Sequence, residues 1–326
     1  MFINLRKILL LSTVIVSTLL TSAQQTNRPF QYPTPPDNLE TLGERTSYLV
    51  EHFWDRCNMK SIFSSKKNFE AAFDDYISFM PYADSAVVFN SIDRLIKEVK
   101  KNQANMATMS RIAREKMYSD TAPYPYDAIY LPFAKAATQS GGLTKEEKET
   151  FTLDASRLSN SQVGMTIPSF DLTLPDGTKT NIRDLKGAYL LVMVDEPDDF
   201  NNRMARTRLA TDYALNELIE KGDVKVILLN IGRPDEDWRQ RAATYPSNWI
   251  IASSQEADRL LDRRFKPAFF YTNKNQTILS KSLRAENLVE AFRTIYNQQN
   301  AIKAERERLR QEALKKKMEE TGSAGQ

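Results

Sequence analysis

The apolar positions in the first half of the chain repeat at helical spacing. The clearest stripe has side chains three or four residues apart, which places them on one face of a helix: Val88, Ile92, Leu95, Ile96 and Val99. The segment Thr144-Lys145-Glu146-Glu147 has the pattern of a capping box that opens a further helix. Residues 37–160 show no clear strand pattern. They therefore predict a compact all-α bundle or array of about six helices.

The pattern changes to that of strands after about Asn160. Pro175-Asp176-Gly177 predicts a hairpin turn between two alternating segments, and two continuous apolar runs are typical of strands covered on both faces. The expected strands are Phe170–Leu174, Thr178–Ile182, Tyr189–Val194, Val224–Leu229, Trp249–Ala252, Ala268–Tyr271 and Thr277–Ser280. The expected helices are Phe200–Lys221, Glu256–Phe265 and one from about Glu286. This order predicts an α/β domain with a mixed sheet and helices on both faces.

Residues 1–23 have the composition of a secretory signal peptide. Arg6 and Lys7 form a basic start, Ile8–Leu20 is apolar, and small residues follow at the expected cleavage site. The alternative, an uncleaved membrane anchor, is disfavoured because the apolar stretch is shorter than the roughly 20 residues that span a bilayer. We therefore expect export to the periplasm or elsewhere in the cell envelope, with no integral membrane segment after cleavage.

These patterns together predict an α+β chain of two domains. A proline-rich, extended leader (24–36) precedes the helical domain (37–160), and the α/β domain (161–300) follows. Residues 301–326 predict a charged helical tail. The segment Ile302–Glu320 is dense in Lys, Arg and Glu and lacks a sustained apolar heptad, so a coiled coil is not expected.

Charge and rare residues narrow the possible chemistry. The formal net charge is +3, which gives no reason to expect a nucleic acid as partner. His52 is the only histidine and Cys57 the only cysteine, which disfavours a His-based metal site, a catalytic triad and an intramolecular disulfide. Cys57 is expected on a helix with Phe53 and Trp54, as a small buried side chain. No glycine-rich phosphate loop follows a strand, and we expect no metal or other cofactor.

Three stretches of the second half resemble segments of a known protein family. They are the strand Tyr189–Val194 with the segment Asp195–Arg203 after it, the loop Phe265–Phe270, and the turn Asn273–Gln276. Together they resemble exported bacterial thioredoxin-like proteins of the TlpA/peroxiredoxin-type superfamily, in which the second stretch is a cis-proline loop. The resemblance implies a thioredoxin-like fold. The first half resembles an uncharacterised helical domain that precedes such domains in bacterial envelope proteins, most clearly at Tyr48–Asp55 and Tyr130–Phe133.

The redox motif of that family is missing from this sequence. When Pro197 and Arg203 are aligned with the family pattern, Asp199 and Asn202 stand at the two cysteine positions of Cys-x-x-Cys. Neither side chain can replace a thiolate in disulfide exchange, so no catalytic residue is assigned. We expect Asp199 to cap the following helix, which would stabilise it by about 1 kcal/mol.

Acidic residues cluster at two places in the second half. One cluster is Asp195, Glu196, Asp198 and Asp199, and the other is Asp235-Glu236-Asp237. Neither has the spacing of an EF-hand loop. We interpret the first as a solvated loop and the second as the start of a short helix leading to Trp238, and we expect no metal site at either.

The resemblance also implies a peptide groove beside the cis-proline loop. In the family, the backbone of the residue before the proline pairs with an extended substrate peptide, and here that residue is Lys266, followed by Pro267. Phe200 would add an exposed apolar contact. In the alternative interpretation, Phe200 packs on the next helix and Pro267 is retained for folding.

We therefore expect a redox-inactive envelope protein, rather than an enzyme, that binds a peptide or protein partner. Two alternatives stay open. One is a thiol-disulfide oxidoreductase of the family's usual kind, acting through Cys57 or through a thiol of a partner. The other is a structural module of an envelope assembly.

Overall fold

The computed structural model describes residues 28–281 and 283–323. The chain divides into two compact units between Ala155 and Ser156, and each is described by itself. The predicted signal peptide (1–23) and the first residues of the predicted leader lie outside the described residues.

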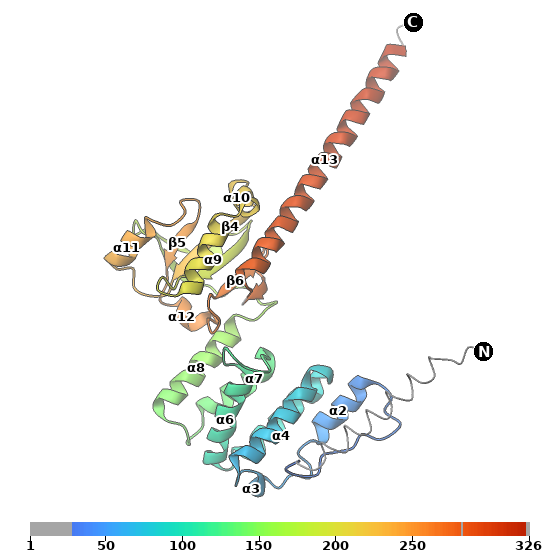
Figure 1. Ribbon diagram of the computed structural model, residues 1–326, viewed down its shortest axis with the longest axis vertical. Coiled ribbons are helices and arrows are strands. Elements are labelled where there is room, and N and C mark those ends of the chain that lie inside the picture. The colour runs from blue at the N-terminus through green and yellow to red at the C-terminus, as the bar shows by residue number, and fades with distance from the viewer. Residues whose placement is uncertain (1–27, 282, 324–326) are drawn as a thin grey trace, which may run out of the picture. The chain divides into compact units, whose positions relative to one another are not determined.

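The first unit is helical and holds no strand in its described residues (Figure 1). Its elements are α2 (Leu42–His52), α3 (Met59–Ile62), α4 (Lys66–Phe79), the 3-10 turn η2 (Met80–Tyr82), α5 (Ser85–Val99), α6 (Gln103–Met117), α7 (Asp127–Thr138) and α8 (Lys145–Asn160), which continues past the division between the units. The pattern of apolar residues does not predict α3, because four residues are too few to carry a helical repeat.

The predicted capping box at the start of α8 is confirmed. The backbone N–H of Thr144 donates to Glu147 Oε2 at 2.9 Å, and the N–H of Glu147 donates to Thr144 Oγ1 at 3.2 Å. The predicted stripe of α5 is confirmed as well, since Val88, Ile92, Leu95 and Val99 are buried and Ile96 is half-buried.

Aromatic side chains fill the centre of the first unit. Phe53, Phe69, Phe73, Tyr76 and Phe133 are fully buried. The leader takes part in this core, because Tyr32 is buried and its hydroxyl donates to Asp75 Oδ2 at 2.8 Å. A segment that the sequence predicts only as extended therefore packs against helix α4.

The prediction that Cys57 lies on a helix is wrong. Helix α2 ends at His52, and Cys57 lies in the connection that leads to α3. Asn58 begins that next helix, because its side-chain oxygen accepts a hydrogen bond from the N–H of Ser61. This cap gives the short α3 its own start and separates it from α2.

The second unit is built on a mixed sheet of seven strands in the order β2-β1-β5-β4-β3-β6-β7. The strands are β1 (Asp171–Thr173), β2 (Lys179–Asn181), β3 (Tyr189–Val194), β4 (Val224–Asn230), β5 (Ile250–Ser253), β6 (Phe269–Thr272) and β7 (Ile278–Lys281). Strand β4 pairs in parallel with β3 and β5, whereas the other pairs are antiparallel. The predicted hairpin is confirmed, with Thr173 opposite Lys179.

Helices cover both faces of this sheet, as predicted. One face packs against α9 (Phe200–Ala210), α10 (Tyr213–Glu220) and the first turns of α13 (Ala285–Ser323), through buried residues such as Leu209, Leu218 and Phe292. The other face packs against α12 (Ala257–Leu260) and the 3-10 turn η3 (Ile182–Asp184). The remaining helix, α11 (Glu236–Ala242), lies between β4 and β5 in the chain (Figure 1).

Two predicted helices differ from the observed ones. The single helix expected over 200–221 is divided into α9 and α10, because Asp212 accepts a hydrogen bond from the N–H of Leu215 at 2.9 Å and caps a new helix. The helix expected over 256–265 ends at Leu260. Leu261 is extended and buried, and Asp262 is held in an ion pair with Lys281.

The last helix continues well beyond the sheet that its first turns cover. Helix α13 is 39 residues long, and the side chains of residues 301–315 are all exposed. Its last turns project away from the sheet (Figure 1). In the part of the chain that the structure describes, no helix combines the length and the apolar character needed to cross a membrane.

Candidate functional site

The site is built around the start of α9, at the carboxyl end of β3. Asp199 is the N-cap of α9, and its Oδ1 accepts a hydrogen bond from the N–H of Asn202 at 2.7 Å. The predicted role of Asp199 as a helix cap is confirmed. The carboxylate also lies at the end of the helix where the dipole favours negative charge.

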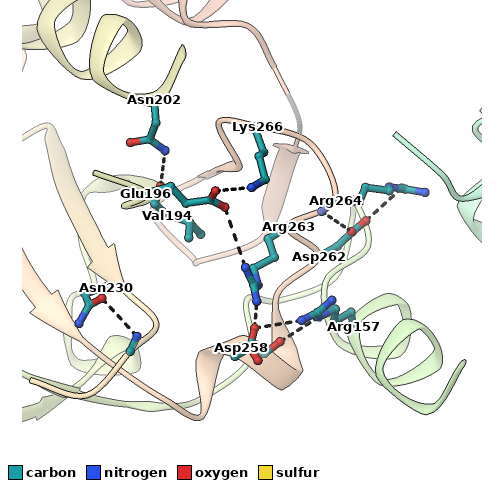
Figure 2. Close-up of polar contacts among 11 residues, drawn as sticks. Arg157, Val194, Glu196, Asn202, Asn230, Asp258, Asp262, Arg263, Arg264 and Lys266 are labelled. Atoms are coloured by element: carbon teal, nitrogen blue, oxygen red, sulfur yellow. Dashed lines mark hydrogen bonds and ion pairs between the residues drawn. The ribbon is translucent and has the colours of Figure 1, made fainter. Parts of the chain in front are cut away.

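Asn202 holds the first turn of α9 to the end of β3. Its side chain is 1% exposed, and its Nδ2 donates to the backbone oxygen of Val194 at 2.8 Å (Figure 2). Its Oδ1 is buried and accepts no hydrogen bond from any described residue. The amide is therefore a fixed cross-link between helix and strand with one unused acceptor.

The loop that precedes β6 contains a cis peptide bond between Lys266 and Pro267. The ammonium of Lys266 lies 2.6 Å from Glu196 Oε2, in the segment between β3 and α9 (Figure 2). This charged hydrogen bond raises the pKa of Lys266. The pair joins the two loops on which the sequence places the site.

Further ion pairs extend from Glu196 to the last turn of α8. The guanidinium of Arg263 lies 3.9 Å from Glu196 Oε1, and its Nε lies 2.7 Å from Asp258 Oδ1. Asp258 also pairs with Arg157 at 2.9 Å, and Figure 2 shows the whole chain of contacts. The loop before Pro267 is thus anchored to α12 and to the part of α8 that belongs to the second unit.

The backbone of Lys266 lies just before the paired part of β6. Strand pairing between β3 and β6 ends with the N–H of Val194, which donates to the oxygen of Ala268 at 3.0 Å. Within the described residues, neither the N–H nor the C=O of Lys266 has a hydrogen-bond partner. An extended chain laid beside it would meet a free donor and a free acceptor.

A groove of about 620 Å³ lies beside this loop. Its walls come from α9, from the Lys266–Pro267 loop and from the start of α13. The residues that line it are Asn201, Met204, Ala205, Thr207, Arg208, Thr211, Lys266, Pro267, Arg284, Ala285 and Glu286. It thus includes two of the residues predicted for a peptide groove, Lys266 and Pro267.

Phe200 is the first residue of α9 and does not pack on the next helix. Its side chain is 65% exposed, and the guanidinium of Arg203 lies 6.0 Å from its ring centre. Met204, one helical turn further along α9, lines the groove and is 54% exposed. The two form an exposed apolar strip on α9, because residues four apart share a helix face. Only Met204 of this strip lines the groove, and Phe200, the third residue predicted for a peptide groove, is not among the lining residues.

The carboxylates of the acidic segment before α9 bind different partners. Asp195 is buried, and it accepts hydrogen bonds from Arg206 at 2.8 Å and from the hydroxyl of Tyr245 at 2.8 Å. Burial raises the pKa of Asp195 against the opposing effect of these partners. Glu196 faces Lys266, and Asp199 caps α9. Among the described residues, no group of three or more acidic, His or Cys side chains could hold a metal ion.

The second acidic cluster begins α11, as predicted. Asp235 is its N-cap and accepts a hydrogen bond from the N–H of Trp238 at 2.9 Å.

Sequence reasoning missed nine of the eleven residues that line the groove, among them Met204, Arg208 and Arg284. Met204 has a signal in the sequence, because it lies four residues after Phe200 on the predicted helix. Arg208 follows one turn later. Arg284 has no such signal, since only the packing of α13 beside α9 brings it to the groove.

Cys57 lies in the first unit and is half-buried. Burial raises the pKa of its thiol to about 11. At neutral pH the thiol is therefore almost entirely protonated, which is unfavourable for nucleophilic attack.

Comparison with known proteins supports the fold. Residues 14–160 match the model of a family described as a domain of unknown function, DUF5106. A crystal structure of a thioredoxin-like protein from Bacteroides caccae aligns with a TM-score of 0.65 and 21% identity, over 82% of this chain and 99% of that one. No curated protein matches the chain.

Two shorter structures align with about two-fifths of this chain. The alignment with a conserved protein of unknown function from Bacteroides fragilis spans 40% of this chain and 98% of that one, at 24% identity and a TM-score of 0.38. The alignment with the thioredoxin domain of a thiol-disulfide oxidoreductase from Bacteroides vulgatus spans 42% of this chain and 99% of that one, at 21% identity and a TM-score of 0.36.

The chain thus combines a helical region with a mixed sheet flanked by helices, and it shares this arrangement with the thioredoxin-like protein from Bacteroides caccae. The predicted fold class is confirmed. The protein has an N-terminal helical part, which matches DUF5106, followed by a thioredoxin-like fold.

Proposed function

We propose that the thioredoxin-like unit is redox-inactive and binds an extended peptide segment of a partner protein beside the Lys266–Pro267 loop. The observation that carries this proposal is the unpaired backbone of Lys266 at the edge of a groove of about 620 Å³. A peptide that pairs with this backbone gains main-chain hydrogen bonds, and its side chains reach the groove.

The exposed apolar strip supports the same interpretation. Phe200 and Met204 leave large apolar side chains exposed to water on α9, and Met204 lines the groove. Burying about 100 Å² of such surface contributes roughly 2.5 kcal/mol before the cost of ordering the peptide. These two side chains are therefore the expected apolar contacts of the bound segment.

The absence of cysteine from the second unit is the reason to propose binding without redox chemistry. The only cysteine of the sequence is Cys57, in the first unit. In this proposal Asp199 and Asn202 occupy the positions of a Cys-x-x-Cys motif and serve as helix cap and as helix–strand cross-link. The protein then has no catalytic residue and needs no cofactor.

The proposal includes a place in the cell envelope. It rests on the signal-peptide pattern of residues 1–23. Determination of the N-terminal residue of protein recovered from the envelope tests it. An intact Met1 would contradict cleavage.

The alternative function, a thiol-disulfide oxidoreductase, can be tested separately. A disulfide-reductase assay on the wild-type protein and on Cys57→Ser is expected to give background rates for both. Activity that is lost in Cys57→Ser would replace our proposal with an oxidoreductase acting through that thiol. Because Cys57→Ser has no thiol of its own, activity that appears only when envelope extract is added would indicate chemistry through a thiol of a partner.

Partner binding is tested by affinity capture from envelope extracts. Phe200→Asp places a charge in the apolar strip, whereas Leu309→Asp makes the same kind of change at an exposed position of α13, far along the helix. We expect specific partners to be lost with Phe200→Asp and retained with Leu309→Asp. If both variants, correctly folded, retain every partner, the groove is not the binding site and the structural-module alternative is favoured.

A further inference from the structure

We propose that the groove selects extended peptide segments that carry an acidic side chain, which binds to Arg284. This inference rests on the proposed peptide binding and names the class of peptide. It follows from the charged side chains of the groove, where positive charges outnumber negative ones.

Three basic side chains and one acidic side chain line the groove: Lys266, Arg208, Arg284 and Glu286. Two of the basic groups already have carboxylate partners. Lys266 pairs with Glu196 at 2.6 Å, and Arg208 pairs with Glu286. The exposed guanidinium of Arg284 has no hydrogen-bond or ion-pair partner among the residues that the structure describes. The groove therefore contains one positive charge, that of Arg284, for which a ligand would have to supply the negative partner.

The position of Arg284 relates this cation to the bound peptide. Arg284 directly precedes α13, and it lines the same groove as Met204 on α9 and the Lys266–Pro267 loop. A segment that pairs with the backbone of Lys266 and places an apolar side chain on Met204 would occupy this groove. An arginine fork matches the geometry of a carboxylate, so Asp or Glu is the side chain that completes the site.

The carboxylate is assigned to a side chain rather than to the end of a peptide. Pairing at Lys266 uses the main chain of an extended segment, which continues along the groove. Terminal carboxylates, in contrast, are typically captured by nests of backbone N–H groups. Here the group without a partner among the described residues is an exposed side chain that lines the groove.

The test is a display selection in which the purified protein enriches binders from a library of random nonapeptides with blocked C-termini. The same selection is run with Arg284→Glu, with Phe200→Asp and with Arg310→Glu. The last variant changes the net charge equally, but at an exposed position far along α13. Selected peptides are then synthesised with Glu replaced by Gln, and binding is measured at low and at physiological salt.

We expect the wild type and Arg310→Glu to enrich Asp or Glu at one position beside an apolar residue. Arg284→Glu should lose this preference or favour Lys and Arg. Replacing Glu by Gln in a selected peptide should weaken binding to the wild type about threefold, more at low salt, and should not weaken binding to Arg284→Glu.

The other outcomes separate the two proposals. Peptides that bind the wild type but not Phe200→Asp, without acidic preference, would overturn the role of Arg284 and leave peptide binding intact. A preference for acidic peptides that persists in Arg284→Glu would also overturn it. If only peptides with free C-termini bind in a parallel library, the groove captures a terminal carboxylate instead. If no peptide depends on Phe200, the proposed function itself fails.

Discussion

Asp262 and Lys281 form an ion pair of 2.9 Å that is almost wholly enclosed, with 0% and 8% of their side chains exposed. The guanidinium of Arg264 lies 3.0 Å from the same carboxylate oxygen. This cluster ties the loop before Pro267 to the edge strand β7. Burial alone would raise the pKa of Asp262, but the two cations outweigh this effect and lower it below the ordinary value of 3.8.

Replacement of Asp262 by Asn should strongly destabilise the second unit at neutral pH. Lys281 and Arg264 would stay buried beside each other without the carboxylate, which typically costs about 3–5 kcal/mol of unfolding free energy. The measurement is urea unfolding followed by tryptophan fluorescence, in a Trp54→Phe background. The signal then comes from Trp238 and Trp249, both in the second unit.

The same variant has a defined dependence on pH. Because the native state favours ionised Asp262, its stabilisation is complete above the ordinary pKa and is lost as the pH falls through the lower native value. The difference between wild type and Asp262→Asn should therefore shrink below about pH 4. Asp198→Asn, at an exposed position, is the control and should not change stability. A difference that stays constant with pH would contradict the ion-pair explanation.

Asp199→Ala should lower the unfolding free energy of the second unit by about 1 kcal/mol, because the N–H of Asn202 loses its cap. Asp199→Asn should cost much less, since asparagine caps helices about as well as aspartate does. Both are measured by urea unfolding in the Trp54→Phe background. Equal losses in the two variants would show that the charge of Asp199, and not its capping bond, stabilises the site.

Cys57 should react slowly with iodoacetamide. Burial raises its pKa to about 11, so the thiolate fraction at a given neutral pH is about 300-fold lower than for an exposed cysteine with a pKa of about 8.5. The alkylation rate, followed by mass spectrometry, should rise with pH up to about 11, and it should increase when urea unfolds the protein. A rate that levels off near pH 8.5 in the folded protein would contradict this prediction and strengthen the oxidoreductase alternative.

Deletion of residues 302–326 should leave the second unit as stable as before. The side chains of α13 that pack on the sheet come from its first turns, up to Tyr296, whereas those of residues 301–315 are exposed. The expected change in unfolding free energy is within about 0.5 kcal/mol. Phe292→Ala, which removes a buried side chain from the same helix, is the positive control and should cost about 3–5 kcal/mol. A large loss on deletion would mean that the tail makes contacts of its own.

Local patterns in the sequence predict most of the second unit. Asp176-Gly177 predicts the hairpin, and the apolar runs around Leu191 and Ile227 predict two central strands. Periodicity alone does not divide the helix after Phe200, because the apolar repeat continues across the break. The signal was nevertheless present, since Asp212 is a good N-cap residue in the middle of the expected helix.

The groove is harder to predict than the fold. The resemblance to thioredoxin-like proteins predicts Phe200, Lys266 and Pro267 as groove residues. Arg208 and Glu286 are 78 positions apart in sequence, and only the packing of α13 beside α9 lets them pair. Tertiary contacts of this kind decide which charged side chains have an opposite charge beside them. The sequence alone therefore does not distinguish paired from unpaired charges. For this reason the sequence pattern does not predict that Arg284 lies in the groove.

The amide of Asn202, bonded to the oxygen of Val194, has one further consequence. A pair of cysteines at the start of a helix exists in two covalent states, and the surface around it can differ between them. The second unit contains no cysteine, and an amide hydrogen bond neither gains nor loses electrons. The groove should therefore keep one shape in oxidising and in reducing surroundings, so that its affinity for a ligand would be independent of the ambient redox potential.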